Sequence, residues 1–230
     1  KIGIEKTCPG AMQEGLSKHS VIGLVSEAAH YSNATLAGWL GMGTNQLWKI
    51  PTDESISMRL DRFEQSLEEA YCQGHKVAFA IGTFGTTDAY GVDDIAGMRT
   101  ILEDVSKRHG QTTPHLHVDA AVGWVSCFFS EYNLDTNPLG LHPDILPQVK
   151  RTQLATKGFR FADSVTIDFH KMGWGHYPSS AFIVNRREDL KYLLRDKSEA
   201  PYFCEADYRH DPALFTLECS RPAIGPYTVM

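Results

Sequence analysis

Several features that mark other protein classes are absent from this sequence or sparse in it. No apolar run approaches the roughly 20 residues of a transmembrane helix, and the amino end shows no secretory-signal pattern of charged, apolar and small residues. The 230 residues carry 22 basic and 28 acidic side chains, a net charge of −6, so a nucleic-acid-binding surface is not expected. With 42% hydrophobic and 22% charged residues, the composition is globular rather than disordered, collagen-like or coiled-coil.

Cysteine is scarce and widely spaced. The five cysteines are an odd number, and no two lie within four residues of each other, so zinc-knuckle spacing is absent. We therefore expect free thiols and a cytoplasmic protein. The cysteines are Cys8, Cys72, Cys127, Cys204 and Cys219.

Both ends of the sequence look cut. Lys1 stands where a start Met is expected, and residues 216–222, close to Met230, read as the beginning of a helix. We expect the chain to be a piece of a longer polypeptide, with residues 1–230 forming one large domain of it.

Short apolar runs alternate with amphipathic stretches along the chain. Residues 134–147, with three prolines and a glycine, are the best candidate for a loop. The alternation predicts an α/β fold whose parallel or mostly parallel sheet has helices on both faces. Ligands of such sheets bind at the carboxyl ends of the strands. The expected strands are 21–25, 77–81, 115–118, 164–167 and 181–184, and the expected helices are 33–42, 58–71, 93–107 and 188–195.

Chemically useful side chains follow these predicted strands. Taken singly, each has an ordinary explanation. An Asp at a strand end is typical of a helix cap, and a Lys in a loop is typically a solvated charge. Gly85-Thr86-Thr87 is typical of a turn. Together they fit pyridoxal phosphate, which needs a Lys for its Schiff base, an acid at its ring nitrogen and a flat partner for its ring. Lys171, Asp119 and His30 supply these three roles.

Four ordered blocks carry a family resemblance that spans the chain from about residue 20 to its end. The chain resembles the large domain of the pyridoxal-phosphate-dependent group II amino-acid decarboxylases, which have the three-layer aspartate-aminotransferase fold. The blocks are Ala29-His30-Tyr31-Ser32, Gly85-Thr86-Thr87 with Gly91 and Asp93, His117-Val118-Asp119-Ala120-Ala121, and residues 162–171, which end in Asp168-Phe169-His170-Lys171.

The resemblance implies a role for each matched residue. Lys171 would form the Schiff base, and Asp119 would form a salt bridge with the pyridine nitrogen. His30 would stack on one face of the ring and help to orient the substrate carboxylate, with Ala121 against the other face. Thr87 would touch the ring hydroxyl or the side of the substrate carboxylate.

Further positions follow from the same resemblance. His170 and Asp168 match positions that contact the cofactor phosphate, although a carboxylate would repel a phosphate dianion. Tyr202 matches a mobile-loop tyrosine that protonates the carbanion after carbon dioxide leaves, and Tyr208 is its rival.

This sequence also departs from the family pattern. Phe169 stands where the family usually has Pro. The upstream phosphate-binding turn and the small carboxyl-terminal domain have no counterpart here, which agrees with the expectation of a fragment.

The implied reaction is decarboxylation of an L-amino acid to its amine, with pyridoxal 5′-phosphate as cofactor and a homodimer as the assembly. Residues 162–178 look most like bacterial tyrosine decarboxylases, which favours an aromatic substrate over glutamate or aspartate. The alternatives are another carbon–carbon lyase or an aldehyde-forming enzyme on this fold, a non-catalytic homologue, and a metal hydrolase built on His115, His117 and Asp119. Neither a membrane nor a nucleic-acid partner is expected.

Overall fold

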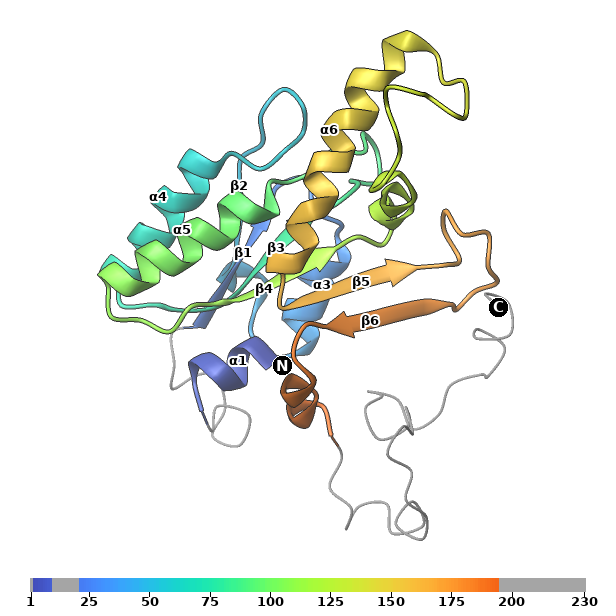
Figure 1. Ribbon diagram of the computed structural model, residues 1–230. Coiled ribbons are helices and arrows are strands. Elements are labelled where there is room, and N and C mark those ends of the chain that lie inside the picture. Colours follow the sequence, from blue (N-terminus) through green and yellow to red (C-terminus); the bar gives the residue numbers. More distant parts are fainter. Residues whose placement is uncertain (1, 10–20, 195–230) are drawn as a thin grey trace, which may run out of the picture.

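The computed structural model describes residues 2–9 and 21–194, and this part of the chain is built around one sheet (Figure 1). The strands lie in the order β2-β1-β3-β4-β5-β6. Their bounds are β1 Val21–Ser26, β2 Leu47–Ile50, β3 Lys76–Thr83, β4 His115–Asp119, β5 Ser164–Asp168 and β6 Ser180–Val184. The helices are α1 Ile2–Thr7, α3 Ser32–Trp39, α4 Leu60–Cys72, α5 Ile95–Arg108 and α6 Leu146–Thr156. Short 3-10 segments are η2 Thr44–Gln46, η3 Gly123–Phe129, η4 Pro143–Ile145, η5 Lys157–Phe161 and η6 Arg187–Tyr192.

The sheet is mostly parallel, as the sequence predicts. Every strand pair from β2 to β5 is parallel, and only β6 runs antiparallel to its neighbour β5. All five predicted strands are present, each within two residues of its expected bounds.

Helices cover both faces of the sheet, which confirms the three-layer prediction. On one face, α4 and α5 bury Phe63, Leu67 and Leu102 completely against the strands. On the other face, α1 and α3 bury Ile4 and Ala37 in two smaller clusters; Figure 1 shows the two pairs of helices on opposite sides of the sheet. Most of the buried apolar side chains belong to the cluster on the α4–α5 face, so this face carries most of the core. Burying each large apolar side chain contributes about 1.5–3 kcal/mol.

Helix boundaries follow from capping and from the backbone conformation of the preceding residue. The Asp94 side chain accepts the N–H of Gly97 at 3.0 Å and caps α5, so this helix begins after the predicted residue 93. Arg59 has an extended backbone, and α4 therefore begins after the buried Met58.

Two α-helices and one strand were not predicted, and two predictions need correction. The sequence reading missed α1, β2 and α6. The predicted loop 134–147 overlaps η4 and the first turn of α6, where Pro147 is tolerated because the first helical N–H groups have no partner within the helix. Residues 188–195 were expected to form an α-helix, whereas a 3-10 segment covers 187–192.

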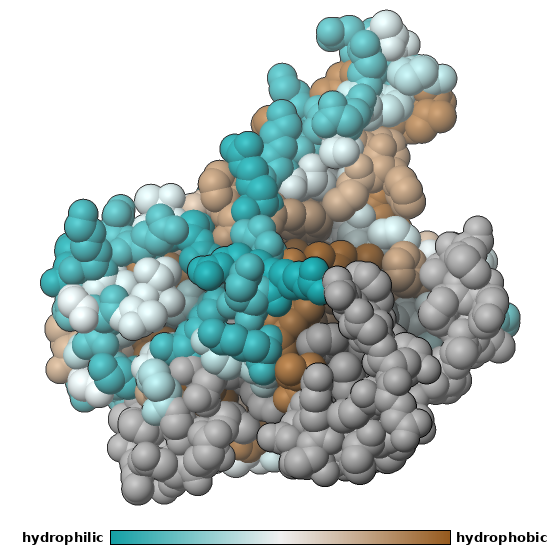
Figure 2. Space-filling model, turned by 60° about the horizontal axis from the view of Figure 1, so that its bottom comes forward, coloured by the Kyte–Doolittle hydropathy of each residue, from teal (hydrophilic) through white to brown (hydrophobic). Residues whose placement is uncertain are grey.

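The visible surface is mostly hydrophilic, with hydrophobic residues gathered toward the middle of the face in Figure 2. None of the helices in the described ranges combines the length and hydropathy needed to cross a bilayer.

Candidate active site

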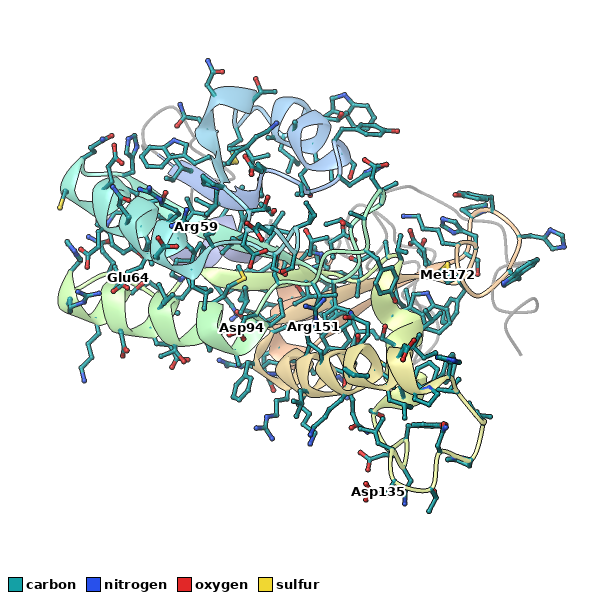
Figure 3. All side chains as sticks on the ribbon, turned by 90° about the horizontal axis from the view of Figure 1, so that it is seen from above. Arg59, Glu64, Asp94, Asp135, Arg151 and Met172 are labelled. Carbon is teal, nitrogen blue, oxygen red and sulfur yellow. The ribbon has the colours of Figure 1, made fainter. Side chains whose placement is uncertain are left out.

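Four neighbouring strands end at one edge of the sheet, and each end carries a predicted site residue. The register pairs Asp119 on β4 with Thr83 on β3 and with Thr166 on β5. His30, Thr87 and Lys171 lie within four residues of the ends of β1, β3 and β5. Parallel strands lie about 4.8 Å apart, so β1 to β5 spans about 14 Å at this edge. Figure 3 shows Met172, the residue after Lys171, on the loop beyond β5.

Asp119 ends β4 as a partly buried carboxylate. Its Oδ1 accepts the backbone N–H of Ala121 at 3.1 Å, and Ala121 itself is buried. The turn is fixed to the sheet because Ala120 N–H donates to Thr166 O at 3.0 Å. Among the described residues, Asp119 has no ion-pair partner within 4.0 Å. Within the described part of the chain, this carboxylate is therefore not paired with a cation.

Two histidines precede Asp119 on the same face of β4. His115 Nε2 and His117 Nδ1 each lie 2.8 Å from Ser164 Oγ, and His117 Nε2 lies 3.2 Å from Thr166 Oγ1. Burial lowers the pKa of each histidine to about 4. Both rings are therefore neutral at physiological pH, and they add no positive charge beside Asp119.

His30 is held by the first turn of α3. The backbone N–H of Ser32 donates to His30 Nδ1 at 3.3 Å, and Ser32 Oγ lies 2.9 Å from the same nitrogen. Nδ1 therefore acts as an acceptor, which leaves Nε2 to carry the ring proton. The ring centroid of Tyr31 lies 4.1 Å away. The imidazole is fixed in place, and its Nε2 has no hydrogen-bond partner among the described residues.

The turn that carries Thr87 is closed by its own hydrogen bonds. Gly85 N–H and Thr86 N–H both donate to Gly91 O, at 2.9 and 3.1 Å, and Thr86 Oγ1 accepts Gly91 N–H at 2.8 Å. Gly85 has φ +92°, and a Cβ there would lie 2.7 Å from Gly123 N. Gly85 is needed because the turn packs directly on the segment after Asp119. Thr87 itself is exposed.

Lys171 is held in an ion pair at the end of β5. Its Nζ lies 2.9 Å from Asp168 Oδ2, and Ser180 Oγ donates to Asp168 Oδ1 at 2.6 Å. Trp124 Nε1 donates to Asp168 O at 3.0 Å, so the backbone of this turn is fixed from η3.

His170 lies beside this pair. Its Nε2 is 3.6 Å from Asp168 Oδ2, and its Nδ1 accepts the N–H of Ser179 at 3.0 Å. The ring of Tyr177 lies against it, with the centroids 3.7 Å apart.

The sequence reading gave no role to three residues that hold this edge together, namely Ser32, Trp124 and Ser180. Their partners are set by tertiary contacts and by the antiparallel β5–β6 register, in which Ser180 lies opposite Asp168.

Tyr202 and Tyr208 lie outside the described residues. Within the described ranges, no group of three or more His, Cys, Asp or Glu side chains is placed to hold a metal ion. The proposed metal ligands His115 and His117 contact Ser164 instead.

Comparison with known proteins identifies the family. The conserved domain of pyridoxal-dependent decarboxylases matches residues 4–136, more than half of the chain. The chain is 31% identical to aspartate 1-decarboxylase of Aliivibrio fischeri, with 76% of this chain and 28% of the relative covered. It is 30% identical to L-tyrosine decarboxylase of Enterococcus faecium, with 79% and 31% covered.

A solved structure, mouse CSAD in its apo form, superposes with a TM-score of 0.75 at 22% identity, covering 99% of this chain and 42% of that one. This likeness confirms the expected aspartate-aminotransferase-like fold. The chain spans about a third of the length of the curated relatives it matches. It belongs to the pyridoxal-dependent decarboxylase family.

Proposed function

We propose that this chain, as a member of that family, is part of a pyridoxal-phosphate-dependent carboxy-lyase that converts an L-amino acid to its amine and carbon dioxide. One observation carries the proposal. Adjacent strand ends bring a histidine, a threonine, an aspartate and a lysine to one edge of a parallel sheet, which is the usual ligand position in such folds.

The residues present at this edge fit the cofactor. Asp119 is a partly buried carboxylate without a cation partner among the described residues, which suits a protonated ring nitrogen. Ala121, which the resemblance assigns to the opposite face of the ring, is small and buried. When bound, the cofactor supplies an electron sink for the carbanion formed as carbon dioxide leaves.

The side chains have separate tasks in this proposal. Lys171 binds the cofactor aldehyde, and His30 lies against the ring and uses its Nε2 proton to orient the substrate carboxylate. Thr87 contacts the ring hydroxyl or the substrate carboxylate. Tyr202 donates the proton that completes the amine, with Tyr208 as the alternative donor.

The phosphate contact goes to His170 in this proposal. Its ring is fixed between Tyr177 and the backbone of Ser179, so its position is preorganised. Both oxygens of Asp168 already have donors, and a carboxylate repels a phosphate dianion, so this proposal does not assign the phosphate contact to Asp168.

An aromatic, tyrosine-like amino acid is the proposed substrate. The support is the resemblance of residues 162–178 to bacterial tyrosine decarboxylases and the similarity to the Enterococcus faecium enzyme. Glutamate or aspartate is the second candidate, because the aspartate 1-decarboxylase of Aliivibrio fischeri is similar to the same degree.

The proposal extends to the assembly. Residues 1–230 form most of the cofactor-binding large domain, and the working enzyme is a cytoplasmic homodimer. These points rest on the family resemblance and on the scarce, widely spaced cysteines.

Absorbance and chemical trapping test the proposal. The purified protein is mixed with pyridoxal 5′-phosphate, its visible spectrum is recorded, and the adduct is reduced with borohydride and mapped by mass spectrometry. We expect a visible band and a reduced adduct on Lys171, both lost in Lys171→Ala and kept in the control Lys107→Ala. Carbon dioxide release is then compared for tyrosine, glutamate and aspartate. No band with added cofactor, or an adduct on another lysine, would refute the proposal.

A further inference from the structure

The indole of Trp124 contacts the turn that carries Lys171 on both sides of the lysine. Before the lysine, Trp124 Nε1 donates to the backbone oxygen of Asp168 at 3.0 Å. The ring of Phe169 lies edge-to-face against the indole, with the centroids 5.2 Å apart and the planes at 70°. After the lysine, a Cβ built on Gly173 would lie 2.9 Å from Trp124 Cζ2, so the backbone there lies directly against the indole. One side chain thus spans the turn.

Trp124 is itself anchored beside the strand ends on the other side of the site. Its backbone N–H donates to the oxygen of Ala120, the residue after Asp119, at 3.0 Å. The preceding Gly123 donates its N–H to Phe84 O at 3.0 Å, and a Cβ there would lie 2.0 Å from the same oxygen. The indole also packs against the apolar core on the α4–α5 face. This side chain is therefore fixed to the residues that follow β3 and β4.

We infer that Trp124 is the positioning residue of Lys171 and sets its place relative to Asp119. This inference rests on the proposed function. In that function Asp119 meets the ring nitrogen and Lys171 binds the aldehyde, and these two groups stand para to each other on one rigid pyridine ring. The two side chains must therefore keep a constant separation, because small displacements at a reacting centre are costly. A side chain that ties the two turns together meets this requirement.

The same contact gives Phe169 a task. The family usually has Pro at this position, and Pro restricts its own backbone φ to about −65°. Phe lacks this restriction, but its ring provides the aromatic contact with Trp124. In this chain the turn is held by a side chain that packs on it rather than by a restricted backbone.

Hydrogen exchange of the cofactor-free protein tests the contact. Amide exchange is followed by mass spectrometry in the wild type and in Trp124→Phe, which keeps an aromatic ring on the core and loses the indole N–H. The amide of Gly175 closes the turn by donating to Phe169 O at 2.8 Å. We expect residues 168–175 to exchange about fivefold faster in the variant, since the turn loses one hydrogen bond, while α5 is unchanged. The control is Trp48→Phe, at another partly buried tryptophan on the far edge strand β2, and it should match the wild type over residues 168–175.

Cofactor binding separates positioning of the lysine from general loosening of the site. Dissociation constants are measured by equilibrium dialysis for pyridoxal 5′-phosphate and for pyridoxine 5′-phosphate, which has a hydroxymethyl group in place of the aldehyde and cannot bond the lysine. In Trp124→Phe, affinity for the aldehyde should fall about tenfold, and affinity for the alcohol should change by less than about twofold. Phe169→Leu should lower affinity for the aldehyde about threefold, because it removes the edge-to-face contact. Trp48→Phe should leave both constants unchanged.

The contradicting results are equally specific. An equal loss of affinity for both compounds, or an unchanged affinity for the aldehyde, would overturn the positioning role. Exchange that rises equally in α5 and in residues 168–175, or in neither, would overturn it as well. If Trp124→Phe does not fold, Phe169→Leu decides by the same two measurements. A wild type without preference for the aldehyde refutes the proposed function instead, and the exchange measurement, which needs no cofactor, then decides whether Trp124 holds the turn.

Discussion

The buried Asp93 carboxylate provides a quantitative test of how the turn carrying Thr87 is fixed. Asp93 is 1% exposed, and it accepts the N–H of Met58 on Oδ1 at 2.6 Å and that of Thr83 on Oδ2 at 2.7 Å. Burial raises its pKa from 3.8 to about 6, although the two N–H donors oppose the shift; Asp53 adds slightly to it.

The sign of the resulting pH dependence follows from linkage. Because the pKa is higher in the folded state, the folded protein binds this proton more tightly than the unfolded chain does. The contribution of Asp93 to stability is therefore complete below pH 3.8 and is lost as the pH rises through about 6. A rise of about two pKa units corresponds to about 3 kcal/mol.

Asp93→Asn removes the titrating group while keeping the size of the side chain. Free energies of unfolding in urea are measured for wild type and variant between about pH 4 and pH 7, where most of the change falls. As the pH rises across this range, the free energy of unfolding of the wild type should fall by about 2–3 kcal/mol relative to that of the variant. Asp94→Asn is the matched control, because Asn caps a helix about as well as Asp, and its profile should parallel the wild type. If the two free energies of unfolding differ by the same amount at every pH, the reasoning is refuted.

Three further substitutions test the site and the segments that support it. Asp119→Asn should lower kcat about a hundredfold without changing the unfolding temperature, since it removes only the charge that we propose for the ring nitrogen. Steady-state kinetics checks this, and an unchanged kcat would contradict the proposed role. Ser164→Ala should lower the free energy of unfolding in urea by about 2–4 kcal/mol, because the Ser164 hydroxyl is the shared partner of both histidines on β4. A loss well below about 1 kcal/mol would show that the histidines find other partners. Gly123→Ala should destabilise by about 1–3 kcal/mol in thermal unfolding, because its Cβ would lie 2.0 Å from Phe84 O, and a wild-type melting curve would contradict that close contact.

The sequence was sufficient to predict the elements with a clear period. The α4 face formed by Phe63, Leu67 and Ala70 is fully buried, as its spacing predicts. Glu64 and Glu68 of the same helix pair with Arg108. In contrast, β2 has four residues, with Lys49 exposed between apolar neighbours, and is too short to give a period.

The candidate site could be predicted as a set of residues but not as a set of contacts. Motif order and strand ends were enough to predict that Asp119 and Lys171 lie at one edge. Asp168, which pairs with Lys171, also accepts the hydroxyl of Ser180, which is brought opposite by the turn between β5 and β6. No local pattern encodes which strand follows that turn or in which register it returns.

The period-2 alternation of β4 and β5 explains why the polar residues of the site lie together. The apolar residues of these strands point toward α4 and α5. The polar residues alternate with them and point to the opposite face of the sheet. A one-residue slip of either strand would exchange the two sets and place polar groups in the core, so burial of the apolar set fixes the register. Apolar packing between the sheet and the helices α4 and α5 therefore positions Asp119 and the turn that carries Lys171. The apolar set is Leu116, Val118, Val165 and Ile167, and the polar set is His115, His117, Asp119, Ser164 and Thr166.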